Sequence, residues 1–298
     1  MRNRQSFHGI YPILYAFFDA DGRPSRDGIV AQVEAAVRHG AHGVAVLGIA
    51  TETNKLDALE RRTIMEWTAQ ALDGRLPLAV TIAEPSVHGQ VAFARAAHEA
   101  GANWVILQPP PVAGLAEIEY LRFFGAVADA APLAVAIQNA AQFLGIGLSN
   151  AGLATLHRNH PNVSLLKGEA PAHVIARLVD DTAGAFRVFN GRGGLELPDC
   201  LRAGCVGMIP APECFDLQVA VYEAFRAGRE DEAEAHYRAM LPFVTFMTSS
   251  IDTFVCYGKR IVARRLGLPD VSDRAPAQRP TQFGLAMMER FVAALPPL

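Results

Sequence analysis

The chain has 298 residues, of which 51% are hydrophobic and 19% charged, and a formal charge of −3, a composition typical of a globular protein with a large core. It has no basic excess to attract nucleic acid or an anionic membrane, so we expect a small-molecule partner. The polar start Met1–His8 and the lack of an apolar run of about 20 residues predict a cytoplasmic protein without a signal peptide or membrane span.

Short apolar runs alternate with helical patterns over the first two thirds of the chain. Eight runs read as buried parallel strands: Ile10–Phe17, Val44–Leu47, Leu78–Ile82, Trp104–Leu107, Leu133–Ile137, Val163–Leu166, Phe186–Phe189 and Val206–Ile209. The helical patterns between them include Asp57–Leu72, Val87–Glu99, Ile118–Ala130, Asn150–Arg158 and Ala172–Val179. Eight alternations predict an α/β fold, a (β/α)8 TIM barrel. No Gly-x-Gly-x-x-Gly sequence follows the first strand, which argues against a dinucleotide-binding sheet.

Helical patterns continue after the eighth strand. They cover Leu217–Ala227, Asp231–Met247, Thr253–Leu266 and Pro280–Ala294. We therefore expect a barrel core over residues 1–212, followed over residues 213–298 by the last barrel helix and a C-terminal helical extension.

The cysteines and histidines show no spacing of a metal site. The four cysteines lack a paired Cys-x-x-Cys pattern and a nearby histidine cluster, so they read as small buried hydrophobic residues. We expect no bound metal.

One of only three lysines, Lys167, ends the apolar run of the predicted sixth strand. Catalytic groups of a (β/α)8 barrel come from the carboxyl ends of the strands, where Lys167 is the only lysine. Burial there favours the neutral amine, which can condense with a 2-oxo acid to form an imine. The alternative is a lysine whose stem packs in the core while its ammonium reaches water.

Four features of the sequence occur together: a Gly-x-x-x-Glu loop from Gly48 to Glu52, Lys167 at the end of strand six, Gly191 after strand seven and the C-terminal helices. In combination they resemble the superfamily of dihydrodipicolinate synthase and N-acetylneuraminate lyase, the class I Schiff-base lyases. The resemblance spans nearly the whole chain. It implies that Lys167 forms the imine, that no metal or organic cofactor is needed, and that the protein is a homotetramer or homodimer.

The chain departs from that pattern at three places. The loop Gly48-Ile49-Ala50-Thr51-Glu52 lacks the two adjacent hydroxyl residues of the family's Gly-Thr-Thr-Gly-Glu sequence. Gln138-Asn139-Ala140 stands where the family usually has a tyrosine for proton transfer, and Pro109-Pro110-Pro111 replaces a segment with a second tyrosine. Dihydrodipicolinate synthase activity is therefore not the preferred interpretation.

The Gln138-Asn139-Ala140 segment is similar to the Gln-Asp-Ala sequence of 2-keto-3-deoxyarabonate dehydratases in the same superfamily. The preferred hypothesis is thus a hydro-lyase that dehydrates a 2-keto-3-deoxy sugar acid. One alternative is a retro-aldol lyase that releases pyruvate, including an enzyme like dihydrodipicolinate synthase or N-acetylneuraminate lyase. Another is a non-catalytic protein that binds or senses a 2-oxo acid.

Several candidate site residues have two possible roles. Tyr15 could return the missing phenol, or it could simply pack with its hydroxyl bonded to backbone. Glu169 could be a general base or a carboxylate at a helix start, and Arg192 could bind a carboxylate or lie on the rim. The predicted catalytic residues are Lys167, Tyr15 and Gln138. The predicted substrate-binding residues are Thr51, Ala50, Asn139, Gly191, Arg192 and Ile209.

Overall fold

The computed structural model describes residues 7–298. Residues 1–6, which make up most of the polar start on which the expected lack of a signal peptide rests, lie outside the described part. Within the described part, none of the helices combines the length and the apolar character that crossing a membrane requires.

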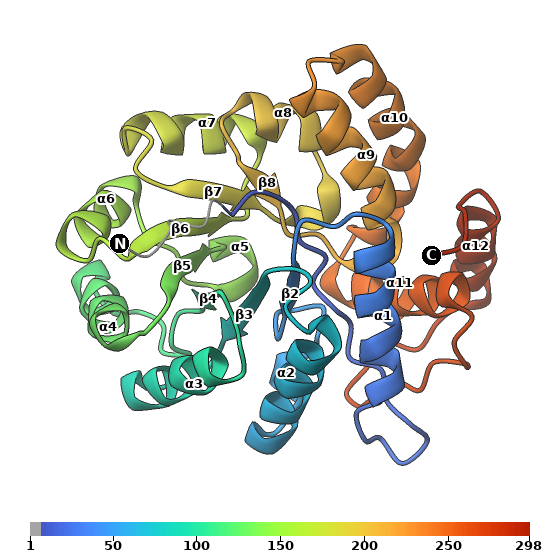
Figure 1. The fold of residues 1–298 in the computed structure, drawn as a ribbon, viewed down its shortest axis with the longest axis horizontal. Coiled ribbons are helices and arrows are strands. Elements are labelled where there is room, and N and C mark those ends of the chain that lie inside the picture. Colours follow the sequence, from blue (N-terminus) through green and yellow to red (C-terminus); the bar gives the residue numbers. More distant parts are fainter. Residues whose placement is uncertain (1–6) are drawn as a thin grey trace.

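Eight parallel strands form the centre of the molecule (Figure 1). They are hydrogen-bonded in the order β1-β8-β7-β6-β5-β4-β3-β2, and a bridge between Ile13 and Ala45 joins the two outer strands. The predicted (β/α)8 barrel is therefore confirmed. The strands are β1 Gly9–Ile10, β2 Val44–Val46, β3 Leu78–Ile82, β4 Trp104–Leu107, β5 Ala134–Asn139, β6 Val163–Gly168, β7 Arg187–Asn190 and β8 Gly207–Met208.

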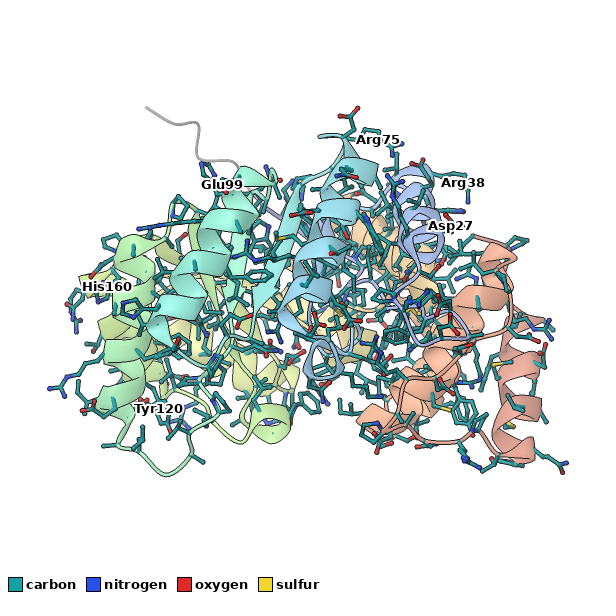
Figure 2. All side chains as sticks on the ribbon, turned by 90° about the horizontal axis from the view of Figure 1, so that it is seen from below. Asp27, Arg38, Arg75, Glu99, Tyr120 and His160 are labelled. Atoms are coloured by element: carbon teal, nitrogen blue, oxygen red, sulfur yellow. The ribbon has the colours of Figure 1, made fainter. Side chains whose placement is uncertain are left out.

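Helices surround the sheet on its outer face, and the C-terminal helices stand at one side of the barrel (Figures 1 and 2). The barrel helices are α1 Arg26–Arg38, α2 Ala58–Leu72, α3 Val87–Glu99, α4 Glu117–Ala130, α5 Ala141–Leu144, α6 Asn150–Asn159, α7 Ala172–Asp181, α8 Leu197–Arg202 and α9 Phe215–Arg226. The expected extension follows as α10 Glu230–Met247, α11 Ile251–Leu266 and α12 Gln282–Val292.

The first strand is shorter than predicted. Pro12 has no N–H group, so regular ladder bonding stops after Ile10. The chain nevertheless continues along the barrel wall, because Tyr11 N donates to Met208 O at 3.0 Å and Ile13 N to Pro210 O at 2.7 Å. The predicted segment Ile10–Phe17 thus follows the barrel without being a regular strand throughout.

Aromatic side chains fill part of the barrel interior. Tyr11 packs edge-on against Trp104 and Phe189, with ring centroids 5.7 Å and 5.3 Å away, and all three side chains are buried. Packed aromatic rings of this size leave little room for a ligand at their level of the barrel.

Candidate active site

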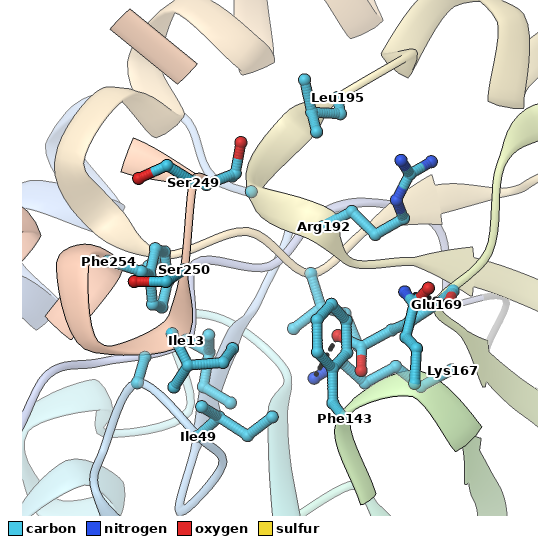
Figure 3. A pocket seen from close by; sticks show the side chains of 17 residues that line it. Ile13, Ile49, Phe143, Lys167, Glu169, Arg192, Leu195, Ser249, Ser250 and Phe254 are labelled. Atoms are coloured by element: carbon cyan, nitrogen blue, oxygen red, sulfur yellow. Dashed lines mark hydrogen bonds and ion pairs between the residues drawn. The ribbon is translucent and has the colours of Figure 1, made fainter. Parts of the chain in front are cut away.

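A cavity of about 290 Å³ lies at the carboxyl ends of the strands. Its wall combines Lys167 and Glu169 of β6 and the following loop with Arg192 after β7 and with residues 248–251 and Phe254 around the start of α11. Figure 3 shows Lys167 and Glu169 on one side of the cavity and Ser249, Ser250 and Phe254 across from them. The extension therefore closes one wall of the cavity.

Lys167 is buried and has a carboxylate beside it. Its side chain is 4% exposed, and its Nζ lies 3.4 Å from Oε1 of Glu169, whose side chain is 7% exposed. The two residues are two apart along an extended segment, so their side chains lie on the same face. The structure thus places Lys167 in the cavity wall and not with its ammonium in open water.

Amide groups and a glycine hold the Glu169 carboxylate in place. Gln138 Nε2 donates to Glu169 Oε2 at 2.9 Å, and Gln142 Nε2 donates to the backbone carbonyl of Glu169 at 2.9 Å. A Cβ atom on Gly191 would lie 2.2 Å from Glu169 Oε1. Gly191 therefore leaves the space that the carboxylate occupies, a role that the sequence did not predict.

Thr51 stabilises the loop after β2 and is completely buried. Its hydroxyl donates to Leu14 O at 2.6 Å and accepts from Leu47 N at 2.9 Å. The cavity is lined instead by the two residues before it, Ile49 and Ala50. Within residues 7–298, the N–H groups of Ile49 and Ala50 have no hydrogen-bond partner.

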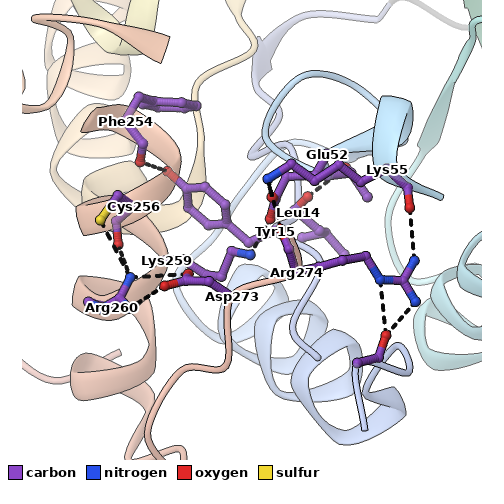
Figure 4. Close-up of polar contacts among 12 residues, drawn as sticks. Leu14, Tyr15, Glu52, Lys55, Phe254, Cys256, Lys259, Arg260, Asp273 and Arg274 are labelled. Atoms are coloured by element: carbon purple, nitrogen blue, oxygen red, sulfur yellow. Dashed lines mark hydrogen bonds and ion pairs between the residues drawn. The ribbon is translucent and has the colours of Figure 1, made fainter. Parts of the chain in front are cut away.

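Glu52 anchors the loop after β2 because it lies between Lys55 and Lys259, the other two lysines of the chain (Figure 4). Lys55 Nζ contacts Glu52 Oε2 at 2.5 Å, and Lys259 of α11 forms a buried ion pair with Oε1. Burial lowers the pKa of Lys259, whereas the nearby Glu52 carboxylate opposes this shift. All three lysines therefore pair with carboxylates, but only Lys167 lines the cavity of about 290 Å³.

Tyr15 lies outside the group of residues that lines the cavity. Its phenol is completely buried and donates to Glu213 Oε2 at 3.2 Å and to the Phe254 carbonyl at 3.3 Å. Burial, followed by the Glu213 carboxylate, raises the pKa of Tyr15 well above 10. The packed alternative thus describes Tyr15 better than a phenol that faces substrate.

Two of the other predicted binding residues line the cavity, and Asn139 instead holds the backbone of a nearby loop. Arg192 and Ile209 line the cavity, and Arg192 forms an ion pair with Glu196. Asn139 does not contact the cavity, because its side-chain amide bonds both the N–H and the carbonyl of Leu148, at 2.7 Å and 3.0 Å.

Residues 7–298 contain no cluster of three or more histidine, cysteine or acidic side chains suited to a metal ion. The four cysteines are buried and free, as their spacing predicted.

Comparison with known proteins identifies the family. A family model for the dihydrodipicolinate synthetase family matches residues 6–285. The chain belongs to this family. The predicted resemblance is therefore confirmed, and the protein is an enzyme of the lyase type, not a binding-only protein.

Relatives within the family carry different activities in their names. The chain is 26% identical to an L-2-keto-3-deoxyarabonate dehydratase of Azospirillum brasilense, over 79% of this chain and 78% of the relative. It is 25% identical to an N-acetylneuraminate lyase of Mediterraneibacter gnavus, over 93% and 88%. The solved structure of YagE from Escherichia coli K12 with pyruvate superposes with a TM-score of 0.89 at 23% identity, over 96% and 98% of the two chains. This last likeness shows the fold.

Part of the site was not predicted from the sequence. Gln142, Phe143 and residues 248–251 line the cavity but lie in short helical or loop segments that carry no catalytic motif. The hydroxyl run Thr248-Ser249-Ser250 between two predicted helices is the one signal in the sequence that could have pointed to this wall.

Proposed function

We propose that Lys167 forms an imine with the carbonyl carbon of a 2-oxo acid and that the protein dehydrates a 2-keto-3-deoxy sugar acid. The observation that carries the proposal is the buried Lys167 amine in the cavity wall, 3.4 Å from the Glu169 carboxylate. A carboxylate at this distance accepts a proton from the lysine ammonium and later stabilises the cationic imine.

The substrate carboxylate is assigned to the backbone of the loop after β2. The N–H groups of Ile49 and Ala50 are free of protein partners and belong to residues that line the cavity. Successive backbone N–H groups bind anions without a side-chain hydroxyl. This arrangement compensates for the two hydroxyl residues that the loop lacks.

The chemical steps use one amine and one carboxylate. The neutral amine of Lys167 attacks C2. The carbonyl oxygen leaves as water with one amine proton and the proton that Glu169 had taken from the ammonium, so a cationic imine and an ionised Glu169 remain. Glu169 takes a proton from C3, and the C–H electrons form the enamine. The enamine electrons then return and expel the C4 hydroxyl, which leaves as water with the proton from Glu169. One water finally hydrolyses the unsaturated imine and restores the amine.

Gln138 holds the carboxylate toward these atoms through its bond to Glu169 Oε2. An amide does not ionise near neutral pH and so is no general acid or base, and we assign Gln138 a positioning role. The acid–base role that a tyrosine has elsewhere in the family belongs to Glu169 in this proposal.

The second candidate is retro-aldol cleavage of the C3–C4 bond from the same imine. The relative named as an N-acetylneuraminate lyase supports it, and the relative named as a dehydratase supports the preferred reaction. The Gln138-Asn139-Ala140 segment favours dehydration, because its resemblance is to the dehydratases.

Incubation with a panel of 2-keto-3-deoxy sugar acids, followed by chromatography, separates the two reactions. Dehydration gives an acid of the same carbon number, whereas cleavage releases pyruvate. We expect the dehydrated product and its complete loss in Lys167→Ala. Pyruvate as the main product would replace the dehydratase assignment by the aldolase.

A further inference from the structure

Three polar side chains at adjacent strand ends form a hydrogen-bonded relay, and its last member, Glu169, forms an ion pair with Lys167. Gln108 follows β4, Gln138 lies in β5, and Glu169 follows β6. Gln108 Nε2 donates to Gln138 Oε1 at 2.9 Å, and Gln138 Nε2 donates to Glu169 Oε2 at 2.9 Å. The other oxygen of Glu169 lies 3.4 Å from Lys167 Nζ. This relay of side chains therefore spans the ends of three neighbouring strands.

The hydrogen bonds of this relay can run in only one donor-to-acceptor direction when Glu169 is ionised. A carboxylate only accepts hydrogen bonds, so the NH2 group of Gln138 must face Glu169. The carbonyl of Gln138 then points the opposite way and needs a donor. Gln108 supplies this donor, which makes the observed orientation of Gln138 the favoured one.

Gln108 lies apart from the predicted reacting atoms. It lines a second cavity of about 430 Å³ and, among residues 7–298, is not one of those lining the cavity that contains Lys167. Its backbone is held on both sides, because its N–H donates to Ile82 O and its carbonyl accepts from Gln90 Nε2, each at 2.9 Å. Gln108 is thus a well-fixed donor outside the reaction cavity.

We propose that Gln108 is a positioning residue which, through the amide of Gln138, keeps Glu169 in the ionised, proton-accepting state beside Lys167. The inference rests on the proposed function of Glu169 as the base. It assigns a role to Gln108, which does not line the cavity predicted to hold the substrate. The role depends on whether the side chain at position 108 donates a hydrogen bond to Gln138 or accepts one.

Two variants at position 108 test whether hydrogen-bond donation from this side chain matters. Gln108→Glu replaces the donor by an acceptor, so Gln138 turns its NH2 group toward position 108 and its carbonyl toward Glu169. That arrangement favours the protonated acid at position 169 and removes the base. Gln108→Met keeps the length of the side chain but leaves the orientation of Gln138 undetermined.

The readout is exchange of the pyruvate methyl protons in D2O, followed by NMR as a function of pH. Exchange needs the imine and a base but not the natural substrate. For Gln108→Glu we expect the acid limb of the kcat profile to move up by about one pH unit. For Gln108→Met we expect kcat to fall about tenfold, with the KM for pyruvate little changed.

Gln32→Met is the matched control. It removes a buried glutamine amide that bonds the backbone of Tyr15 and Gly28 and takes no part in the side-chain relay. We expect a lower melting temperature and an unchanged pH profile. Melting curves of all three variants identify any that fail to fold, and the Met variant then still tests the loss of kcat.

Profiles of both Gln108 variants that coincide with that of the wild type would overturn the inference. Borohydride trapping of pyruvate on Lys167 is measured in parallel. If the wild type is trapped and the Gln108 variants behave normally, the role of Gln108 is wrong and the imine stands. If the wild type is not trapped, the proposed function itself is wrong.

Discussion

At the scale of single residues, two buried carboxyl groups, those of Glu169 and Glu213, lie in different environments. Glu169 lies beside Lys167, whereas Glu213 lies behind the cavity wall and accepts a hydrogen bond from Tyr15. The first has a cation and an amide donor for its two oxygens. The second accepts from the Tyr15 phenol, while Arg265 donates to the backbone carbonyl of Glu213. The two carboxyl groups therefore have different polar surroundings.

Gly191→Ala tests the placement of Glu169. The new Cβ would overlap the carboxylate, with its nearest atom at 2.2 Å, and so would displace it from Lys167. We expect exchange of the pyruvate protons to fall by roughly a hundredfold. Trapping of Lys167 by borohydride should persist, because the amine is untouched. Unchanged exchange would show that the carboxylate position does not matter.

Glu213 makes stability depend on pH. Burial raises the pKa of Glu213 from 4.5 to about 7, although bonds from the backbone and Tyr15 oppose the shift. Because the folded-state pKa is the higher one, the free energy of unfolding decreases as the pH rises through this interval. The full effect corresponds to roughly 3 kcal/mol.

Glu213→Gln should remove this dependence, because the amide stays neutral at every pH. We expect the wild type to lose about 3 kcal/mol relative to the variant between about pH 4 and pH 8. Chemical denaturation at several pH values measures the difference. Parallel stability curves for the two proteins would contradict the account.

At the scale of secondary-structure elements, the loop after β2 is tied to α11 by charge. Glu52 has a left-handed backbone, with φ of 55°, and its carboxylate reaches both Lys55 and Lys259. Figure 4 shows the ion pair linking the two elements beneath the loop. The position of the loop after β2 therefore depends on a helix of the C-terminal extension.

Lys259→Met should leave Glu52 buried with only one cationic partner. We expect a loss of stability on the order of 3 kcal/mol, because Oε1 of the buried Glu52 carboxylate loses the cationic donor that it bonds in the wild type. The double variant with Glu52→Gln should recover part of this loss. Denaturant unfolding of both proteins checks the coupling, and strictly additive losses would argue against it.

The elements themselves were largely predictable, but the side-chain partners were not. The apolar runs indicated seven of the eight strands at nearly their observed places, since buried parallel strands are apolar on both faces. Pro12 shortened the first strand, an effect that proline makes predictable in principle. Lys167 was identified because it ends such a run.

The functions of Gly191 and Gln108 could not be predicted from the sequence. Both depend on distances across neighbouring strands, which no local pattern specifies. The commitment of Thr51 and Asn139 to backbone bonds likewise appears only when the loops are folded.

At the scale of the whole molecule, the helical extension and the barrel form one site. Residues around the start of α11 close the cavity opposite β6, so the activity should require both parts of the chain. The outer surface carries a run of exposed apolar side chains after β4, with Val112, Leu115 and Ile118 about half exposed. Exposed apolar clusters of this kind are typical of contact surfaces.

We expect the protein to be a homotetramer or homodimer in solution, as the family resemblance implies. Light scattering should give a mass about four times or twice the 32.1 kDa of the chain. Leu115→Asp should lower this mass if the exposed run is part of an interface. A single-chain mass for the wild type would contradict the expectation.

The central claim is that Lys167 forms the imine, and reductive trapping tests it most directly. The wild-type protein is treated with pyruvate and borohydride, and its peptides are mapped by mass spectrometry. We predict one reduced pyruvyl group on the peptide containing Lys167, and none on the peptides containing Lys55 or Lys259. Labelling of another lysine with Lys167 unmodified, or no labelling at all, would contradict the account.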